Sequence, residues 1–337
     1  MNDASAPTHD VYDVVGIGNA IVDVLTSVSD DFLHQENLLK GSMQLVDGHD
    51  AARLYNKLGQ CVECSGGSAA NTIAGLASLG AKVAFIGKIH NDQMGQVFAH
   101  DIRSTGVTFN TLPTTSGPST ARCLVLITPD AQRTMSTHLG ASNSLTCDDI
   151  DTDLITRSKV TYLEGYLWDP DDAKEAFMLA MRTAHAAGRK VAMSLSDPFC
   201  VGRYRDEFLH LAEHQVDLLF ANELEILSLY QVDHFEDAVK KVKGHCEVAI
   251  LTRSEKGCVI VSGDDVITLS AHPAHPVVDT TGAGDLFAAG FLYGYTQDKS
   301  LRDCGIMGNL IASEIITHRG ARPDINLKDF LEQNMPV

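Results

Sequence analysis

Residues 279–292 read DTTGAGDLFAAGFL, a loop of small residues followed directly by a strongly apolar helical stretch. Glycine lets the backbone approach an anion closely, and the unpaired N–H groups of a first helical turn point outward with the positive end of the helix dipole behind them. The pattern therefore predicts a phosphate site at Gly282, Ala283 and Gly284. For Asp285 an ordinary capping role is an equally simple explanation, because the same dipole favours a carboxylate there.

A second glycine cluster, SGGSAAN at residues 65–71, also precedes an apolar helical stretch, which runs to Gly80. Two glycine-lined helix starts in one α/β domain predict two ligands held close together. Neither cluster ends in the Gly-Lys-Ser/Thr of a Walker A loop, and GIGNAI at residues 16–21 lacks the third glycine of the dinucleotide fingerprint. Ordinary P-loop and Rossmann sites are thereby excluded.

Short apolar runs alternate with helical patterns along most of the chain. The runs predict strands at 14–17, 83–86, 160–163, 191–195, 218–220 and 248–251, with helices such as 173–187 and 238–242 between them. This order predicts an α/β fold with a mainly parallel sheet wrapped by helices.

Two segments, about 24–59 and 107–135, interrupt that alternation and are richer in Thr, Ser, Gly and Pro. The run 121–127 favours an antiparallel strand. We expect the two segments to pair as a small β lid above the carboxyl ends of the strands, inserted into a single domain spanning 1–337.

Composition restricts the possible partners and location. The formal net charge of the 337 residues is -18, which argues against binding a nucleic-acid backbone. No apolar stretch approaches the roughly 20 residues needed to cross a bilayer, and the start lacks the order of a signal peptide. We therefore expect a cytoplasmic protein without membrane or nucleic-acid contacts. The close pair Cys61 and Cys64 has no matching second pair, which disfavours a metal or redox site.

These motifs identify the sequence as a member of the ribokinase (PfkB) family of ATP-dependent carbohydrate and nucleoside kinases. The stretch from Gly66 to Gly95 resembles the first signature of the family, residues 279–285 resemble the second, and NELE at 222–225 fits its Asn-x-x-Glu element. The resemblance extends from about Tyr12 to Pro323. It implies a ribokinase-like three-layer α/β/α fold that uses ATP and Mg²⁺.

The resemblance also implies a role for each matching residue. Asp285 would accept the proton of the attacking hydroxyl, the N–H groups of residues 282–284 would stabilise the charge on the transferred phosphoryl group, and Arg133 would swing over the phosphates. Without the resemblance, a solvent-facing charge at the end of a strand explains Arg133 equally well.

The remaining implied contacts fall into three groups. The acceptor sugar would be held by Asn19, Asp23, Gly66, Gly67 and Asn71, with Asp23 accepting from two neighbouring hydroxyls. ATP would contact Asn222, Thr252, Ser254, Gly257 and Asn309. Glu225 would hold Mg²⁺ through water, and Asp279 with Thr281 would form a possible K⁺ site together with backbone near Arg319 and Gly320.

Within the family the sequence is most similar to the adenosine-kinase branch, on GNAIVD at 18–23, MQL at 43–45, YLEGYLW at 162–168 and SLSDPF at 194–199. A purine would need apolar walls, which Ile21, Cys123, Tyr166, Leu167 and Trp168 could provide, although ordinary core packing also explains these residues. Glu164 and Asp197 depart from that branch. A sugar kinase acting on ribose, fructose or 2-keto-3-deoxygluconate, and a non-catalytic binding protein on the same fold, remain as alternatives, and the chain could be a monomer or a homodimer.

Overall fold

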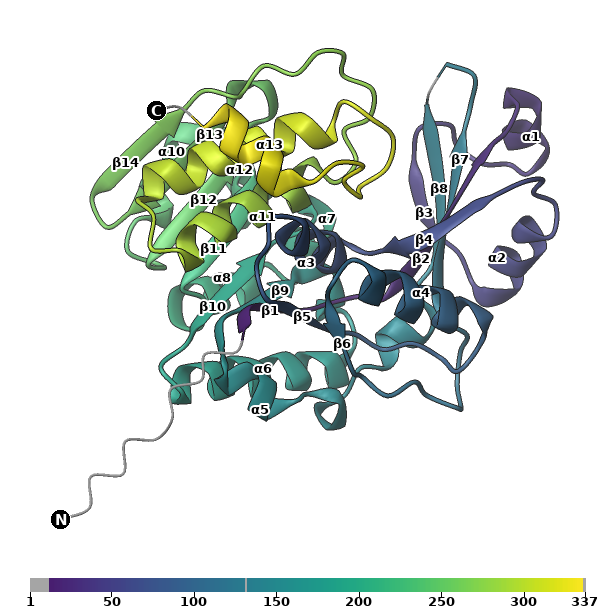
Figure 1. The fold of residues 1–337 in the computed structure, drawn as a ribbon, viewed down its shortest axis with the longest axis horizontal. Helices are drawn as coiled ribbons and strands as arrows, with labels where there is room; N and C mark the ends of the chain where they lie inside the picture. The colour runs from purple at the N-terminus through teal and green to yellow at the C-terminus, as the bar shows by residue number, and fades with distance from the viewer. Residues whose placement is uncertain (1–11, 131, 336–337) are drawn as a thin grey trace.

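The computed structural model describes residues 12–130 and 132–335. Among these residues, no helix combines the length and the apolar character that a membrane crossing requires. Figure 1 shows a large α/β body and a smaller sheet standing to one side of it.

The body contains a nine-stranded sheet in the order β14-β13-β12-β11-β10-β9-β1-β5-β6. Seven strands are parallel neighbours: β6 (Thr108–Phe109), β5 (Val83–Ile86), β1 (Tyr12–Ile17), β9 (Ser158–Glu164), β10 (Lys190–Ser194), β11 (Leu218–Asn222) and β12 (Val248–Thr252). Two antiparallel strands, β13 (Cys258–Ser262) and β14 (Asp265–Leu269), complete one edge. The mainly parallel sheet is as predicted, and each of the six predicted runs lies on one of its strands.

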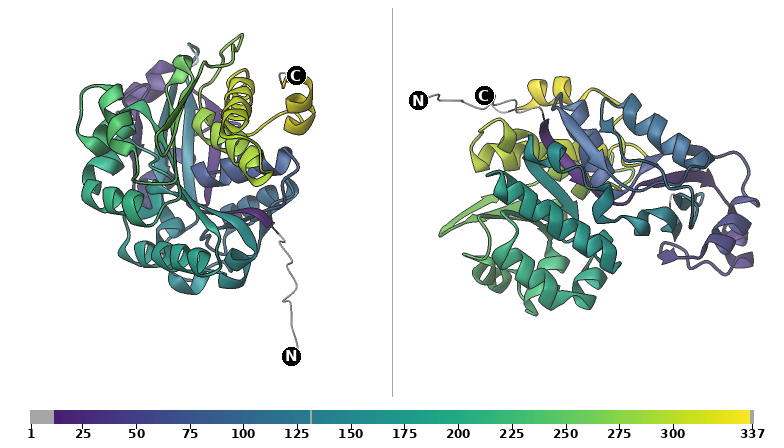
Figure 2. Two further views of the ribbon diagram at one scale, coloured as in Figure 1. Left: turned by 90° about the vertical axis from the view of Figure 1, so that its left-hand side faces the viewer. Right: turned by 90° about the horizontal axis from the view of Figure 1, so that it is seen from below.

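Side-chain alternation along these strands creates two hydrophobic cores, because neighbouring residues such as Val14 and Val15 point to opposite faces of the sheet. One face is covered by α3 (Ser68–Ser78), α4 (Gln93–Ser104), α11 (Ala283–Thr296), α12 (Leu301–Ile315) and α13 (Leu327–Asn334). The other is covered by α5 (Thr152–Thr156), α6 (Asp171–Ala186), α7 (Pro198–Arg203), α8 (Arg205–His214), α9 (Glu223–Tyr230) and α10 (Phe235–Val242). Figure 2 shows these layers on opposite sides of the strands.

The smaller sheet has five strands in the order β3-β8-β7-β2-β4. They are β3 (Met43–Leu45), β8 (Arg133–His138), β7 (Ala121–Ile127), β2 (Ile21–Ser27) and β4 (Val62–Gly66). Two short helices, α1 (Asp30–Gln35) and α2 (Gly48–Tyr55), lie on its side away from the body (Figure 1). The described residues also form four 3₁₀ turns: η1 (Gly140–Ser144), η2 (Cys147–Asp149), η3 (Gly165–Trp168) and η4 (Ser254–Lys256).

The boundaries of the smaller sheet differ from the predicted 24–59 and 107–135. The sheet starts at Ile21, includes residues 62–66 and ends at His138, while residues 108–109 belong to the edge of the main sheet. Strand β7 is antiparallel only to β8 and runs parallel to β2. Only three residues, Gly18, Asn19 and Ala20, separate β1 from β2, and so short a connection does not show in the sequence that the next strand joins a different sheet.

A close contact between α11 and α12 leads to a stability prediction. A Cβ atom on Gly290 would lie 2.7 Å from the backbone oxygen of Met307, a contact that neither helix can relieve by rotating a side chain. We expect Gly290→Ala to lower the free energy of unfolding by about 1–3 kcal/mol, measured by urea denaturation. The matched control is Gly202→Ala in α7, where a Cβ meets nothing within 4 Å. That variant should be neutral or gain up to about 1 kcal/mol from helix propensity. Equal stability of the two variants would contradict the close packing.

Candidate active site

A cavity of about 920 Å³ opens where the carboxyl ends of the main strands meet the smaller sheet. Its floor includes the last residues of four parallel strands, Glu164, Ser194, Asn222 and Thr252. The cavity brings together a large part of the predicted site: Asn19, Asp23, Gly67, Cys123, Tyr166, Asn222, Glu225, Thr252, Thr281, Gly282, Ala283, Gly284 and Asp285. Residues far apart in the sequence thus converge as parallel strand ends require.

Other predicted residues lie outside this cavity. Leu167 is fully buried in the core, and the Asn309 amide donates to the Ser270 carbonyl at 3.1 Å. Ser254 and Gly257 flank the 3₁₀ turn η4 after β12, and Gly257 packs against the backbone of Leu269. Their assignment to ATP binding stays a prediction.

Asp285 connects the two glycine-lined helix starts. It lies in the first turn of α11, and its carboxylate accepts from the Ser68 hydroxyl at 2.6 Å and from the Asn71 amide at 2.9 Å, both on α3. Burial raises the pKa of Asp285, while these two hydrogen bonds and the charge of Arg322 lower it, so that the pKa stays raised overall. Sequence reasoning did not single out Ser68, although its position three residues before Asn71 places both side chains on one face of a helix.

The turn before α11 requires glycine. Gly282 has a φ of 76°, and a Cβ there would lie 2.6 Å from the Cβ of Ala321. Gly282, Ala283 and Gly284 all line the cavity, and the Ala283 N–H donates to the Thr280 carbonyl at 3.3 Å. The three residues of the predicted anion site thus lie together at the cavity, and their binding of phosphate stays a prediction.

Asp23 lies on β2 between Cys64 of β4 and Cys123 of β7, and a Cβ on Gly66 would approach its Oδ2 atom to 2.3 Å. Glycine at position 66 thus leaves room for the carboxylate. Burial raises the pKa of Asp23 to about 7; the charge of Arg322 lowers it, and the neighbouring Asp285 raises it further.

Glu164 explains one departure from the adenosine-kinase pattern. Its side chain is fully buried, Oε1 accepts from the backbone and side-chain nitrogens of Asn19 at 2.7 Å each, and Oε2 accepts from the Ala69 N–H at 2.6 Å. Burial raises its pKa to about 7. Asp197, the second departure, caps α7 by accepting from the N–H groups of Phe199 and Cys200. Both carboxylates therefore have structural partners.

Asn222 and Glu225 form a reciprocal capping box at the start of α9. The Asn222 amide donates to Glu225 Oε1 at 2.6 Å, its backbone N–H donates to Oε2 at 2.9 Å, and the Glu225 N–H returns a bond to Asn222 Oδ1. Burial raises the pKa of Glu225 to about 7. Glu225 lines the cavity, and among the described residues its carboxylate accepts hydrogen bonds from Asn222 and forms no ion pair. Such a carboxylate fits a residue that orders the water shell of Mg²⁺.

Arg133 and Asp279 contact each other beside the main cavity. The guanidinium of Arg133, on β8, pairs with Asp279, whose carboxylate also accepts from the N–H groups of Thr281 at 2.7 Å and Gly320 at 2.9 Å. A guanidinium thus already lies beside the carboxylate of the expected K⁺ site. Both the K⁺ site and the swing of Arg133 over the phosphates stay predictions.

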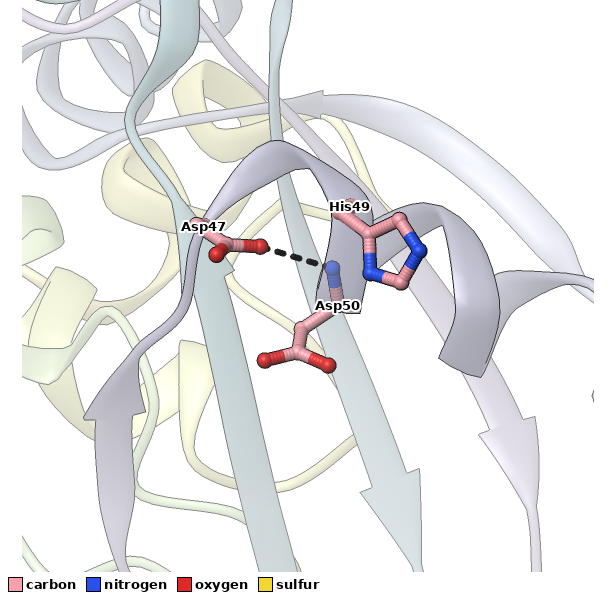
Figure 3. A group of neighbouring side chains, drawn as sticks. All are labelled: Asp47, His49 and Asp50. Atoms are coloured by element: carbon pink, nitrogen blue, oxygen red, sulfur yellow. Dashed lines mark hydrogen bonds between the residues drawn. The ribbon is translucent and has the colours of Figure 1, made fainter.

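Figure 3 shows a different group of potential metal ligands, Asp47, His49 and Asp50, at the start of α2. Asp47 caps the helix by accepting from the Asp50 N–H at 2.8 Å, and Asp50 accepts from Arg53 at 3.2 Å. Helix capping and this ion pair account for the arrangement without a metal.

Comparison with known proteins identifies relatives along most of the chain. The family model described as pfkB family carbohydrate kinase matches residues 44–328. The chain is 48% identical to a solved adenosine kinase from Sinorhizobium meliloti, with a TM-score of 0.90 over 96% of this chain and 100% of that one. A probable sugar kinase from Rhizobium etli gives the same identity and TM-score over 96% of this chain and 98% of that one. Adenosine kinase from Saccharomyces cerevisiae is 27% identical over 91% of this chain and 95% of its own. These structures confirm the predicted ribokinase-like fold.

The raised pKa of Asp23 makes stability depend on pH. The folded chain holds the Asp23 proton up to about pH 7, whereas the unfolded chain releases it near the ordinary value of 3.8, so the wild type loses stability as the pH rises between these values. Asp23→Asn removes this loss. In thermal unfolding, the free energy of unfolding of the variant relative to that of the wild type should increase by roughly 1–3 kcal/mol as the pH rises from about 4.5 to 8. A difference between Asp23→Asn and the wild type that does not change with pH would mean that burial does not shift the pKa of Asp23.

Proposed function

Because the chain belongs to the pfkB family of carbohydrate kinases, which are ATP-dependent, we propose that it transfers the γ-phosphoryl group of MgATP to the 5′-hydroxyl of a ribonucleoside, with adenosine as the preferred acceptor. One observation carries the proposal. Asp285, in the first turn of the helix that follows the glycine loop, is hydrogen-bonded to α3, and the same cavity contains Asp23 among its other carboxylates.

Asp285 acts as the general base in this proposal. Its carboxylate takes the proton of the acceptor hydroxyl as that oxygen attacks the γ-phosphorus, and no covalent intermediate with the protein is required. The first-turn N–H groups of α11 stabilise the negative charge on the phosphoryl oxygens because they are fixed in place before the reaction begins. Arg133 reaches the same phosphates after leaving Asp279.

The acceptor side favours a sugar with neighbouring hydroxyls. Asp23 offers two acceptor oxygens to a vicinal diol. The Oδ1 atoms of Asn19 and Asn71 are buried and have no hydrogen-bond partner among the residues that the structure describes, so they are free to accept from further hydroxyls. These acceptors match a ribose.

The cavity mouth supports a base attached to that ribose. Met43, Leu45 and Phe199 line the cavity with exposed fractions of 48%, 58% and 78%, which is unusual for large apolar side chains without a ligand. Ile21 and Tyr166 extend this apolar lining. Stacking a purine against such walls is worth on the order of 1–3 kcal/mol. Since Glu164 and Asp197 are engaged within the protein, they no longer favour a free sugar.

Asn222 and Glu225 are the residues that would hold the hydrated Mg²⁺, which neutralises phosphate charge when bound. Thr252 lines the cavity beside them, on the side expected to receive ATP. The 48% identical relative named adenosine kinase supports the same acceptor.

The direct test is a coupled kinase assay with MgATP and adenosine, inosine, guanosine, cytidine, ribose, fructose or 2-keto-3-deoxygluconate. We expect adenosine to give the highest kcat/KM, with AMP and ADP formed in equal amounts. Preference for a free sugar would replace the nucleoside by the sugar-kinase alternative. The absence of turnover with every acceptor would favour a non-catalytic binding protein.

Asp285→Asn separates the base from the binding site. The amide keeps the size of the side chain but cannot accept the proton, so kcat should fall by about 10²–10⁴-fold while ATP binding, measured by calorimetry, is retained. The control is Asp172→Asn, exposed in the first turn of α6, which should leave kcat unchanged. A kcat near that of the wild type in Asp285→Asn would remove Asp285 from the role of base.

A further inference from the structure

Arg322 lies after α12, in a segment that the sequence motifs left unexplained. Its Nε and Nη2 atoms donate to the carbonyl and hydroxyl oxygens of Ser65 at 2.9 and 2.8 Å, and Nη1 donates to the Ala70 carbonyl at 2.9 Å. These acceptors lie on either side of the glycine turn at 66–67. The guanidinium therefore ties the end of β4 to the first turn of α3.

The two preceding residues contact the other glycine loop. The Gly320 N–H donates to Asp279 at 2.9 Å, and Ala321 packs so tightly on Gly282 that a Cβ on Gly282 would lie 2.6 Å from the Cβ of Ala321. Residues 320–322 thus join the loop before α11 to the start of α3. The hydrogen bonds of Asp285 to Ser68 and Asn71 join the same two elements from the opposite side.

The charge of Arg322 lies among acidic groups. All three of its hydrogen bonds end on uncharged oxygens, while the ionisable groups that act on it come from four elements: Asp23 on β2, Cys64 on β4, Asp101 on α4 and Asp285 on α11. The negative charge of Asp285 also raises the pKa of four other groups around the cavity: Tyr162, Glu164, Tyr166 and Glu225. The positive charge of Arg322 lowers the pKa of Asp23 and of Asp285, against the effect of burial.

We infer that Arg322 is a positioning residue of the phosphoryl transfer: it fixes the start of α3 against the glycine loop, and its positive charge favours the ionised forms of Asp285 and Asp23 in one buried cavity. It acts through these carboxylates and not on the substrate. The inference rests on the proposed kinase reaction, but not on which acceptor is used.

The first test is the pH dependence of kcat with the best acceptor, for Arg322→Gln and Arg322→Lys. In Arg322→Gln the acidic limb of the profile should move up by about one pH unit or more, because Asp285 loses its cation. At pH values on the acidic limb, kcat of Arg322→Gln should be about tenfold lower than kcat of the wild type at the same pH. At high pH the two kcat values should approach each other. Arg322→Lys keeps the charge and should keep the wild-type limb. The exposed Arg302→Gln on α12 is the control and should match the wild type at every pH.

The second test needs no turnover. Without the guanidinium, the buried carboxylates ionise at a greater cost to the folded state, so the melting temperature of Arg322→Gln should fall progressively below that of the wild type as the pH rises above about 6, where Asp23 of the folded wild type begins to ionise. Arg322→Lys should show a difference that does not change with pH. This series decides the role of Arg322 even if no acceptor is phosphorylated, in which case the proposed function fails separately.

A purely structural role would give different results. It predicts that Arg322→Gln and Arg322→Lys lose activity and stability by factors that do not change with pH, and this outcome would overturn the inference. If Arg322→Gln does not fold, Arg322→Lys decides alone. If the acidic limb of its kcat profile lies at the same pH as in the wild type, the charge of residue 322 is what matters. If the limb lies at a higher pH, the inference is contradicted.

Discussion

The hydrogen bonds from Ser68 and Asn71 to Asp285 are the interaction on which the arrangement of the cavity depends. They join the first turns of α3 and α11, which lie more than two hundred residues apart in the sequence. Each helix start brings the positive end of a helix dipole to the same place. The two hydrogen bonds favour the ionised form of the Asp285 carboxyl between them, but burial outweighs them and its pKa stays raised. The proposed phosphate site and the proposed base are therefore positioned by the same contact between α3 and α11.

The cavity concentrates carboxylates in a chain that is already strongly acidic. Asp23, Glu164 and Glu225 each have a pKa raised to about 7 by burial, and only amide donors or the charge of Arg322 oppose that effect. Backbone and side-chain amide N–H groups satisfy most of the hydrogen-bonding capacity of Glu164 and Glu225, so these two residues hold neighbouring segments of the cavity wall together. Asp23 has no such set of donors. A ligand that brings hydroxyl donors would supply them, which makes Asp23 the carboxylate best suited to bind a diol.

The sequence predicts the main sheet well because buried parallel strands are continuous apolar runs, as at Val83–Ile86. It also predicts the glycine loops, since Gly282 and Gly67 adopt positive φ values that other residues rarely tolerate. The change of sheet after β1 could not be found, because the turn residues Gly18 and Asn19 indicate where a strand ends but not which sheet the next strand joins. The roles of Glu164 and Arg322 could not be found either, since both depend on partners distant in the chain. Leu167 shows the converse error, an apolar residue assigned to the cavity that packs in the core.

The smaller sheet meets the body at both ends of the cavity. At the acceptor end, β2 continues directly from β1, so Asp23 is carried by the chain itself. At the phosphate end, Arg133 of β8 reaches across to Asp279 in the loop before α11. Arg133 cannot cover the phosphates while it holds that carboxylate, so any such movement must first break the ion pair. Because the Arg133 side chain is 23% exposed, water compensates part of that loss, and an incoming triphosphate offers a stronger partner than one carboxylate. The contact that places the sheet before ATP binds is therefore one that ATP itself can displace.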